Sequence, residues 1–470
     1  MAIDYAAAAA KYRDDIIADL STLVAIDSER DVEHATADAP LGPGPAEALA
    51  TMFKIAERDG FSTTNVENVA GRIEVGSGED ILGVLSHLDV VPAGEGWTRT
   101  PFQATIEGNR IYGRGTADDK GPGIAAYYAL KVIRDLQLPL NKRVHLIYGT
   151  DEESKWYGMT RYMETQENPT LGFSPDAEFP IINGEKGIAD FEIQLAHVAA
   201  RAATTTLHAF NAGIRANMVP VTATATLTGA IPTDLEVVAG AFDEANGTKT
   251  AVTPVNNGVT ITLTGRGAHS SIPAGGINAG TYLAALIDQL GLQLDPAGQQ
   301  YLAVITNFLH AETNGARLNI ALTDQKMGPL TASPDIFAFE QDGPQTILVN
   351  VRYPQGTDAE AIRDNMESSI GTDHVNVTIH GRVEEPHYVP ASDPLVQTLL
   401  QVYTDHTGLP GEEGIVGGGT YGRMLQRGVA FGAQMPGAPE VMHMADEYIT
   451  IDDIMRAVAI YADAIVRLAQ

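Results

Sequence analysis

Acidic and imidazole side chains recur along this sequence, each at the end of a short apolar run. Two imidazoles and three carboxylates form the donor set that suits a pair of Zn²⁺-like ions, and a further glutamate beside a ligand suits a general base. We therefore predict a two-metal hydrolase. The segments that carry these side chains are Leu85-Ser86-His87-Leu88-Asp89, Gly115–Gly121 with Asp118-Asp119, Asp151-Glu152-Glu153, Ser174-Pro175-Asp176 and the distant His443.

The spacing within these segments indicates how the side chains could work together. His87 and Asp89 are two residues apart on an extended segment, so both side chains point to one side of the chain. Asp89 can then accept a hydrogen bond from the ring N–H of His87 and leave the other ring nitrogen free for metal. One carboxylate of Asp118-Asp119 can bridge two cations, while one acid of Asp151–Glu153 binds metal and its neighbour takes a proton from water.

Each segment also has a simpler interpretation. His87 can be a core histidine beside a surface acid, and His443 lies in the apolar run Val441–Met444, where a core histidine is common. Asp118-Asp119 can be an ordinary glycine-rich turn, and the remaining acids can be exposed loop residues. All of these interpretations would have to hold together, whereas the donor types complement one another, so we adopt the metal site.

Other catalytic classes lack their essential residues. The sequence has no cysteine, which excludes disulfides, thiolate metal ligands and cysteine nucleophiles. Gly417-Gly418-Gly419-Thr420 resembles an anion-binding nest, but no G-x-x-x-x-G-K-[ST] motif accompanies it, so we do not expect nucleotide binding. A G-x-S-x-G nucleophile elbow is also absent from the sequence.

Composition sets the size and the surroundings of the protein. With 470 residues, 44% of them hydrophobic, we expect two folded domains. The net charge of −30 disfavours nucleic acid and anionic membranes as partners. We see neither a basic, apolar signal peptide at the N-terminus nor an apolar stretch of ~18 residues that could span a membrane. We therefore expect a cytoplasmic protein.

The elements flanking the acidic segments predict an α/β fold. Short apolar strands alternate with amphipathic helices, which is typical of a largely parallel sheet. Because ligands bind at the carboxyl ends of such strands, the placing of His87, Glu152 and Glu153 just past predicted strands supports a site there. The expected elements are a helix at Tyr12–Ile26, strands at Ile81–Ser86 and Val144–Gly149, and a helix at Ile124–Leu136 preceded by the breaker run Gly121-Pro122-Gly123.

The middle of the chain has a different pattern. Apolar residues alternate there with threonines, which predicts half-exposed antiparallel strands. We predict a catalytic domain over 1–186 and 383–470 and an inserted α+β lid domain over 187–382. The expected elements are strands at Val221–Thr228, Val259–Thr264 and Thr346–Arg352, and helices at Ile277–Leu292, Pro394–Asp405 and Ile451–Leu468.

The ordered motifs closely resemble the M20 family of metallopeptidases and, within it, the PepV-type cytoplasmic dipeptidases. The resemblance covers nearly the whole chain. Its motifs are Ser86-His87-Leu88-Asp89-Val90-Val91-Pro92, Gly113-Arg114-Gly115, Asp118-Asp119-Lys120-Gly121-Pro122, Gly149–Ser154, Ser174–Pro180, Ala216-Asn217-Met218-Val219-Pro220, Gly267-Ala268-His269-Ser270, Gly417–Tyr421 and Pro439…His443. One departure is Ser154-Lys155-Trp156-Tyr157-Gly158, where many members carry a small residue and then glycine directly after the acids.

The resemblance implies two Zn²⁺ ions per subunit, with Mn²⁺ or Co²⁺ as alternatives. His87 and Asp176 would bind one ion, Glu153 and His443 the other, and Asp118 would bridge them beside a non-proline cis peptide bond to Asp119. Glu152 would be the general acid/base for a metal-bridged hydroxide. Asp89 would support His87.

The resemblance also assigns roles to residues of the lid. His269 would stabilise the oxyanion, and Asn217 and Arg352 would hold the carboxylate end of the substrate. The glycines Gly417, Gly418 and Gly419 would line the site by close backbone approach.

The expected activity is hydrolysis of small, unblocked dipeptides. We expect a monomer, because the long insert could cover the active site within one chain. Two alternatives remain open. One is an N-acyl amino acid hydrolase or deacylase on the same scaffold, and the other is a metal- or peptide-binding protein without catalytic activity. The presence of Glu152, which binding alone would not need, favours an enzyme.

Overall fold

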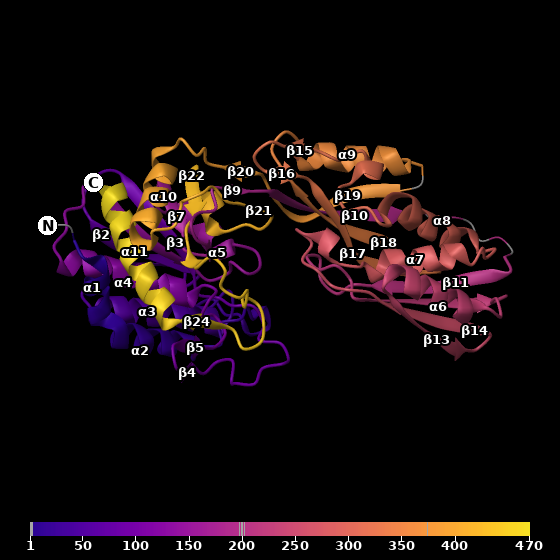
Figure 1. Cartoon of the computed structure of the whole chain (residues 1–470), viewed down its shortest axis with the longest axis horizontal. Helices are drawn as coiled ribbons and strands as arrows, with labels where there is room; N and C mark the ends of the chain where they lie inside the picture. The colour runs from indigo at the N-terminus through magenta and orange to yellow at the C-terminus, as the bar shows by residue number, and fades with distance from the viewer. Residues whose placement is uncertain (1–2, 197, 199–200, 202, 374) are drawn as a thin grey trace. The chain divides into compact units, whose positions relative to one another are not determined.

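The computed structural model describes residues 3–196, 198, 201, 203–373 and 375–470. The chain divides into two compact units (Figure 1). The first unit comprises Met1–Gly184, Tyr388–Ile415 and Gly419–Gln470, and the inserted unit comprises Glu185–His387 and Val416–Gly418. The chain passes between them within the short strands β9 (Gly184–Glu185), β20 (His387–Tyr388) and β21 (Ile415–Val416).

A six-stranded sheet forms the centre of the first unit. Its order is β1-β2-β6-β3-β7-β22, and the three pairs β6–β3, β3–β7 and β7–β22 are parallel, whereas β1–β2 and β2–β6 are antiparallel. All seven residues of β3 are buried, as the unbroken apolar run predicts for a central strand. The strands are β1 (Ser62–Val66), β2 (Ala70–Gly76), β3 (Ile81–His87), β6 (Arg143–Gly149), β7 (Leu171–Ser174) and β22 (Arg427–Ala430).

Helices pack against this sheet and supply much of its core. The C-terminal helix α11 (Ile451–Ala469), yellow in Figure 1, lies beside α4 (Lys120–Asp135), α1 (Tyr5–Ala9) and α10 (Pro394–Thr407). The remaining helices are α2 (Arg13–Val24), α3 (Pro43–Arg58) and α5 (Tyr157–Thr165), with 3₁₀ turns at Ala10–Tyr12, Val32–His34 and Tyr421–Met424; the minor strands are β4 (Thr105–Glu107), β5 (Arg110–Tyr112), β8 (Ala177–Glu178), β23 (Ala433–Gln434) and β24 (Tyr448–Thr450).

The start of α4 differs from the prediction. The breaker run Gly121-Pro122-Gly123 was expected to precede the helix, but it lies inside the first turn, because α4 begins at Lys120. The first-turn N–H groups have no partner within a helix, so Pro122 forfeits no helical hydrogen bond there. The helix therefore begins next to Asp119, at the loop that carries the acidic pair.

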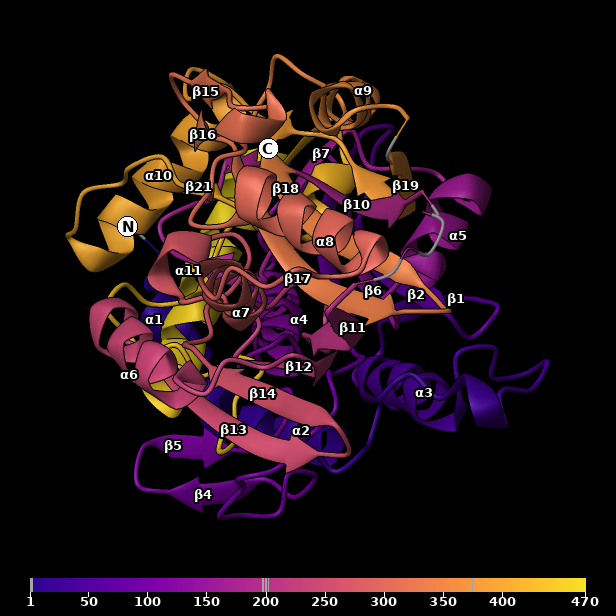
Figure 2. The same cartoon turned by 90° about the vertical axis from the view of Figure 1, so that its right-hand side faces the viewer.

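The inserted unit contains an eight-stranded sheet in which every neighbouring pair is antiparallel. Its order is β13-β14-β12-β11-β17-β18-β10-β19, and Figure 2 shows β13 and β14 side by side. Along β12 the alanines and leucine point inward and the threonines outward, as the alternation predicts. The strands are β10 (Gly187–Leu195), β11 (Thr205–Ala212), β12 (Thr222–Gly229), β13 (Lys249–Val255), β14 (Gly258–Thr264), β17 (Thr331–Glu340), β18 (Gln345–Tyr353) and β19 (Val375–Glu384).

Helices pack on this sheet around a separate hydrophobic core. They are α6 (Leu235–Asn246), α7 (Ala279–Gln289), α8 (Pro296–Val304) and α9 (Ala359–Ile370). A π-helical segment at Ile305–Leu309 follows α8, 3₁₀ turns lie at Pro273–Gly275 and Ala316–Leu318, and β15 (Thr323–Asp324) and β16 (Gly328–Pro329) form a small hairpin. The expected fold, an α/β protein of two domains with an α+β insert, is confirmed. In the described part of the chain, no helix has both the length and the apolar character needed to cross a membrane.

Candidate metal centre

The predicted site residues of the first unit converge at the carboxyl ends of its parallel strands. His87 is the last residue of β3, not the first residue after it as predicted. Glu152 and Glu153 follow β6, and Asp176 follows β7. Because β3 lies between β6 and β7 and is parallel to both, their carboxyl ends bring these side chains to one edge of the sheet.

Asp118 lies between the two histidines. Its Oδ1 is 3.0 Å from Nε2 of His87, and its Oδ2 is 2.9 Å from Nε2 of His443. Asp176 Oδ2 lies 3.7 Å from the same nitrogen of His87, and Glu153 Oε1 lies 3.1 Å from that of His443. The arrangement thus has two halves, each with one imidazole and one terminal carboxylate, joined by the two oxygens of Asp118.

The donor atoms of this group are close enough to share ions. Atoms of His87, Asp118 and Glu153 lie within 4.8 Å of one another, as do atoms of His87, Glu152 and Asp176. Burial raises the pKa of Asp176 and of Glu153 above their ordinary values, and Asp118 raises both further. Packing several carboxylates into one buried site is costly unless cations compensate them. The donor types and their charge therefore fit two divalent cations.

Glu152, the predicted general acid/base, lies in the same buried acidic group, and its pKa, like that of Asp176, is raised. Burial raises its pKa well above the ordinary value, His87 opposes that shift, and the carboxylates of Glu153 and Asp118 add to it. A raised pKa is what a residue needs to accept a proton and later return it near neutral pH.

Asp89 lies beside His87, as predicted, and also contacts the loop that carries the two glutamates. The Nδ1 atom of His87 lies 3.0 Å from the backbone oxygen of Asp89, whereas the nearest carboxylate oxygen is 3.4 Å away. That carboxylate accepts hydrogen bonds from the backbone N–H groups of Glu152 and Glu153, both at 3.0 Å. Asp89 therefore fixes the loop that carries both glutamates as well as the ring of His87.

Asp119, named in the sequence only as the neighbour of Asp118, is a buried support whose role was not predicted. Its Oδ2 accepts hydrogen bonds from the Ser86 hydroxyl at 2.6 Å and from the backbone N–H of His87 at 3.1 Å. Burial raises the pKa of Asp119 to about 7. The peptide bond between Asp118 and Asp119 is cis, as the resemblance implied.

A second missed residue, Glu447, holds the loop that leads to Asp118. This side chain is fully buried. Its Oε2 accepts from the Arg114 guanidinium at 2.7 Å and from Gly115 N–H at 3.1 Å, and its Oε1 accepts from the N–H groups of Ala117 at 2.8 Å and Asp118 at 3.2 Å. One carboxylate therefore fixes the backbone of Asp118 from a position four residues after His443.

Trp156 belongs to the segment Ser154–Gly158, which departs from the family pattern, and it packs behind His87. Trp156 is buried and its ring packs edge-on against Tyr421, with ring centres 5.2 Å apart. Tyr421 in turn meets the ring of His87 edge-on at 6.3 Å. Trp156 therefore reaches His87 through Tyr421, whose ring packs against both.

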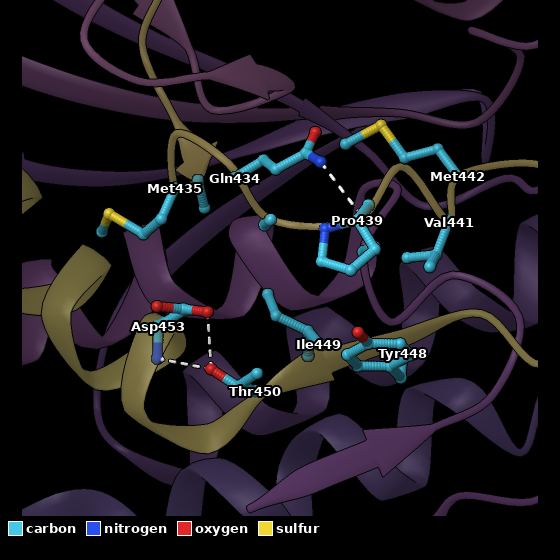
Figure 3. A pocket seen from close by; sticks show the side chains of 12 residues that line it. Gln434, Met435, Pro439, Val441, Met442, Tyr448, Ile449, Thr450 and Asp453 are labelled. Carbon is cyan, nitrogen blue, oxygen red and sulfur yellow. Dashed lines mark hydrogen bonds between the residues drawn. The ribbon is translucent and has the colours of Figure 1, made fainter.

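A small pocket of about 60 Å³ lies beside loops that carry predicted metal ligands (Figure 3). Ala117, which precedes Asp118, lines it, as does Met442, which precedes His443. Ala433 also lines it and pairs with Ala177, which follows Asp176. The pocket is therefore bordered by residues next to Asp118 and His443 and by a strand that pairs with the segment after Asp176.

The other predicted residues belong to the inserted unit, except Gly419, which belongs to the first unit. Within the inserted unit, the segments that carry Asn217 and His269 pair with each other. Arg352 is buried, and it donates hydrogen bonds to the side-chain oxygen of Asn350 and to the carbonyl oxygen of Gly417, each at 2.8 Å. Gly417 approaches Ser271 so closely that an added Cβ would lie 2.7 Å from the serine Cβ.

Comparison with known families decides what kind of protein this arrangement belongs to. The sequence model of peptidase family M20/M25/M40 matches residues 83–467. The chain belongs to this family. It is 44% identical over 465 residues to the Beta-Ala-Xaa dipeptidase of Lactobacillus delbrueckii subsp. lactis, with 97% of each chain covered. The expected recognition and the expected class, a peptidase of the M20 family, are confirmed.

Solved structures support the fold. Human carnosine dipeptidase 1 matches with a TM-score of 0.57 at 16% identity, covering 99% of both chains. The dipeptidase Dug1p from Saccharomyces cerevisiae matches with a TM-score of 0.57 at 12% identity, covering 98% of both chains. At these identities the likeness establishes a shared M20 fold.

Proposed function

We propose that this protein is a broad-specificity dipeptidase that hydrolyses unblocked dipeptides with two divalent cations, Zn²⁺ in the first instance and Mn²⁺ or Co²⁺ as alternatives. One observation carries the proposal: the two carboxylate oxygens of Asp118 face the Nε2 atoms of two different histidines, at 3.0 and 2.9 Å. A carboxylate between two imidazoles is a suitable bridge between two ions, since each oxygen can serve one of them.

His87 and Asp176 would hold one ion, and His443 and Glu153 the other. When bound, such a pair of cations supplies a water of lowered pKa and polarises the scissile carbonyl. The chain itself supplies the proton transfers. Glu152 takes a proton from the attacking water and gives it to the leaving amine, which its raised pKa favours.

The proposal assigns the role of a lid to the inserted unit. His269 donates a hydrogen bond to the developing oxyanion, an interaction that contributes about 3 kcal/mol when it is preorganised. Asn217 and Arg352 hold the carboxylate end of the substrate, and Gly417–Gly419 line the site. Recognition of both ends of the substrate would penalise longer peptides, which is the basis of the dipeptide selectivity.

The similarity to a Beta-Ala-Xaa dipeptidase over nearly the full length of both chains supports a small peptide as substrate. The insert is as long as a whole typical domain, which supports a monomer that supplies its own lid. The cytoplasmic dipeptidases that the chain resembles support the cytoplasm as its compartment.

The test is a comparison of substrates on one protein preparation loaded with Zn²⁺ or Mn²⁺. An Ala-type dipeptide, the tripeptide and an N-acetyl amino acid should be assayed side by side. Cleavage of the dipeptide alone supports the proposal. Cleavage of the N-acetyl compound alone would make the protein a deacylase, and no turnover would favour a binding protein.

A further inference from the structure

Asp335 is a fully buried carboxylate in the inserted unit, on strand β17. The pairing register between β17 and β18 shifts between Pro334 and Ile336, so Asp335 occupies an irregularity of the ladder. Bulges of this kind redirect a side chain away from its normal position in the sheet and are frequent beside functional sites. At this position the carboxylate accepts hydrogen bonds from two hydroxyls, those of Ser270 and Ser333.

The two serines hold different parts of the unit. Ser333 lies two residues before Asp335 on the same strand, and its hydroxyl is 2.6 Å from Oδ1. Ser270, by contrast, directly follows His269 in sequence, and its hydroxyl donates to Oδ2. The Ser270 hydrogen bond therefore links the sheet to the segment that carries the proposed oxyanion donor.

That segment is paired with a second one, which carries Asn217. The backbone N–H of Ser270 donates to the carbonyl of Asn217 at 3.0 Å, and that of Val219 donates to the carbonyl of Ala268 at 2.9 Å. Met218 and His269 face each other across this short antiparallel bridge. Any shift of Ser270 would therefore move the backbone of Asn217 as well.

The segment of Asn217 also rests directly on Asp335. It begins at Gly213, whose φ is +78°, and an added Cβ there would lie 1.7 Å from the backbone oxygen of Asp335. Only glycine fits this close approach at a left-handed backbone position. Asp335 thus contacts one segment through its backbone and the other through its side chain.

The neighbouring strand connects the same region to Arg352. Asn350, which lies opposite Ser333 in the register, accepts from the Arg352 guanidinium at 2.8 Å and donates to Asp190 at 2.6 Å. Burial raises the pKa of Asp335 to about 7, and the hydrogen bonds from Ser270 and Ser333 oppose that shift. Burying an acid here costs free energy, and the hydrogen bonds from the two serine hydroxyls offset part of that cost.

We infer that Asp335 is a positioning residue which, through the Ser270 hydroxyl, fixes the paired segments that present Asn217 and His269. The inference rests on the proposed function for its kinetic consequence, since that function gives His269 its role. Its structural consequence, the fixed pairing of the two segments, is independent of activity.

The two serines offer a matched pair of variants. Ser270→Ala and Ser333→Ala each remove one buried hydroxyl from the same carboxylate, but only the first releases the His269 segment. Asp335→Ala would leave a cavity and could unfold the unit, so the serine variants are the primary test. Hydrogen exchange of the full-length protein should be measured over 217–219 and 268–271, together with kcat and KM for a dipeptide.

We expect Ser270→Ala to speed exchange over these residues about tenfold and to lower kcat about tenfold or more, because a displacement of about 1 Å can cost 100-fold in rate. Ser333→Ala should leave the exchange rate of these residues and kcat within about twofold of the wild-type values. In a His269→Ala background, Ser270→Ala should lower kcat by no more than about twofold, because its effect passes through His269.

Equal exchange in the two serine variants would overturn the inference. Faster exchange in Ser270→Ala with an unchanged kcat would support the fixed pairing and contradict the role that the proposed function gives His269. A wild-type protein that hydrolyses no dipeptide would instead refute the proposed function. In that case the exchange measurement alone decides whether Asp335 fixes the two segments.

Discussion

Replacing Glu447 by glutamine should weaken the metal centre without touching a predicted ligand. The carboxylate accepts four hydrogen bonds, two on each oxygen, from Arg114, Gly115, Ala117 and Asp118. The amide oxygen of glutamine can accept the two hydrogen bonds that one carboxylate oxygen accepted. Its NH₂ group cannot accept the other two, so those two donors would face another donor. Leaving a buried donor without an acceptor costs about 1–3 kcal/mol.

The loss of charge adds to this cost. Arg114 is 1% exposed and would remain buried without its counter-ion. Removing one partner of a buried ion pair typically costs about 3–5 kcal/mol, and this figure already contains part of the hydrogen-bond loss. We therefore expect the free energy of unfolding to fall by about 3–5 kcal/mol, which lowers the melting temperature by about 10 °C for a unit of this size.

The same change should loosen the loop that carries Asp118. Residues that support metal ligands typically contribute 10–100-fold in metal affinity, so we expect a loss of about that size for Glu447→Gln. Calorimetric titration of chelator-stripped protein with Zn²⁺ measures the affinity, and thermal unfolding of the same preparation measures stability. The matched control is Glu440→Gln, which removes the same charge from an exposed position seven residues away.

Wild-type metal affinity and melting temperature in Glu447→Gln would refute this reasoning. A double variant with Arg114→Met provides a further check, since it removes the unpaired buried charge. Its loss of stability should be smaller than the sum of the two single losses.

Three further predictions follow from named contacts. Glu152→Gln should lower kcat by about 10²–10⁴-fold with unchanged metal content, because it removes the proton acceptor; comparable activity at full metal loading would argue against Glu152 as the acid/base. Arg352→Lys should raise KM for dipeptides about tenfold, because the single ammonium of lysine replaces the two-pronged guanidinium that can bind a carboxylate through two hydrogen bonds. An unchanged KM would remove Arg352 from substrate binding. Burial lowers the pKa of His145 from 6.5 to about 4, and Arg72 adds to the effect while Glu74 opposes it, so the histidine stabilises the fold above pH 6.5 and this contribution is lost as pH falls towards 4. His145→Gln should reduce the pH dependence of unfolding between pH 7 and 4 by up to about 3 kcal/mol; identical pH profiles for variant and wild type would contradict this.

The strands that present the predicted metal ligands could be predicted because apolar runs and acids alternate along the chain. His87, Glu152 and Asp176 follow directly from that pattern, since parallel strands bring their carboxyl ends together. The partner of a side chain was less predictable. A spacing of two placed Asp89 beside His87, but it could not show that the Asp89 carboxylate also accepts hydrogen bonds from the backbone of the glutamate loop.

Buried supports were missed because their sequence context resembles an exposed loop. Glu447 follows Asp446, an acid that bonds to Thr98 near the surface, and the two acids look alike in the sequence. The partner that marks Glu447 as buried, Arg114, lies 333 residues away. Asp335 is similar, because the register shift that turns it inwards arises from pairing with β18 and has no local signal.

The central claim is that Asp118 joins two metal sites that act together. The most direct measurement is the recovery of dipeptidase activity as chelator-stripped protein is titrated with Zn²⁺, with bound metal counted in the same samples. The structure predicts that activity reaches its maximum at two bound ions per chain and that Asp118→Asn abolishes tight binding of both. Full activity at one ion per chain, or activity that survives complete removal of metal, would contradict the account.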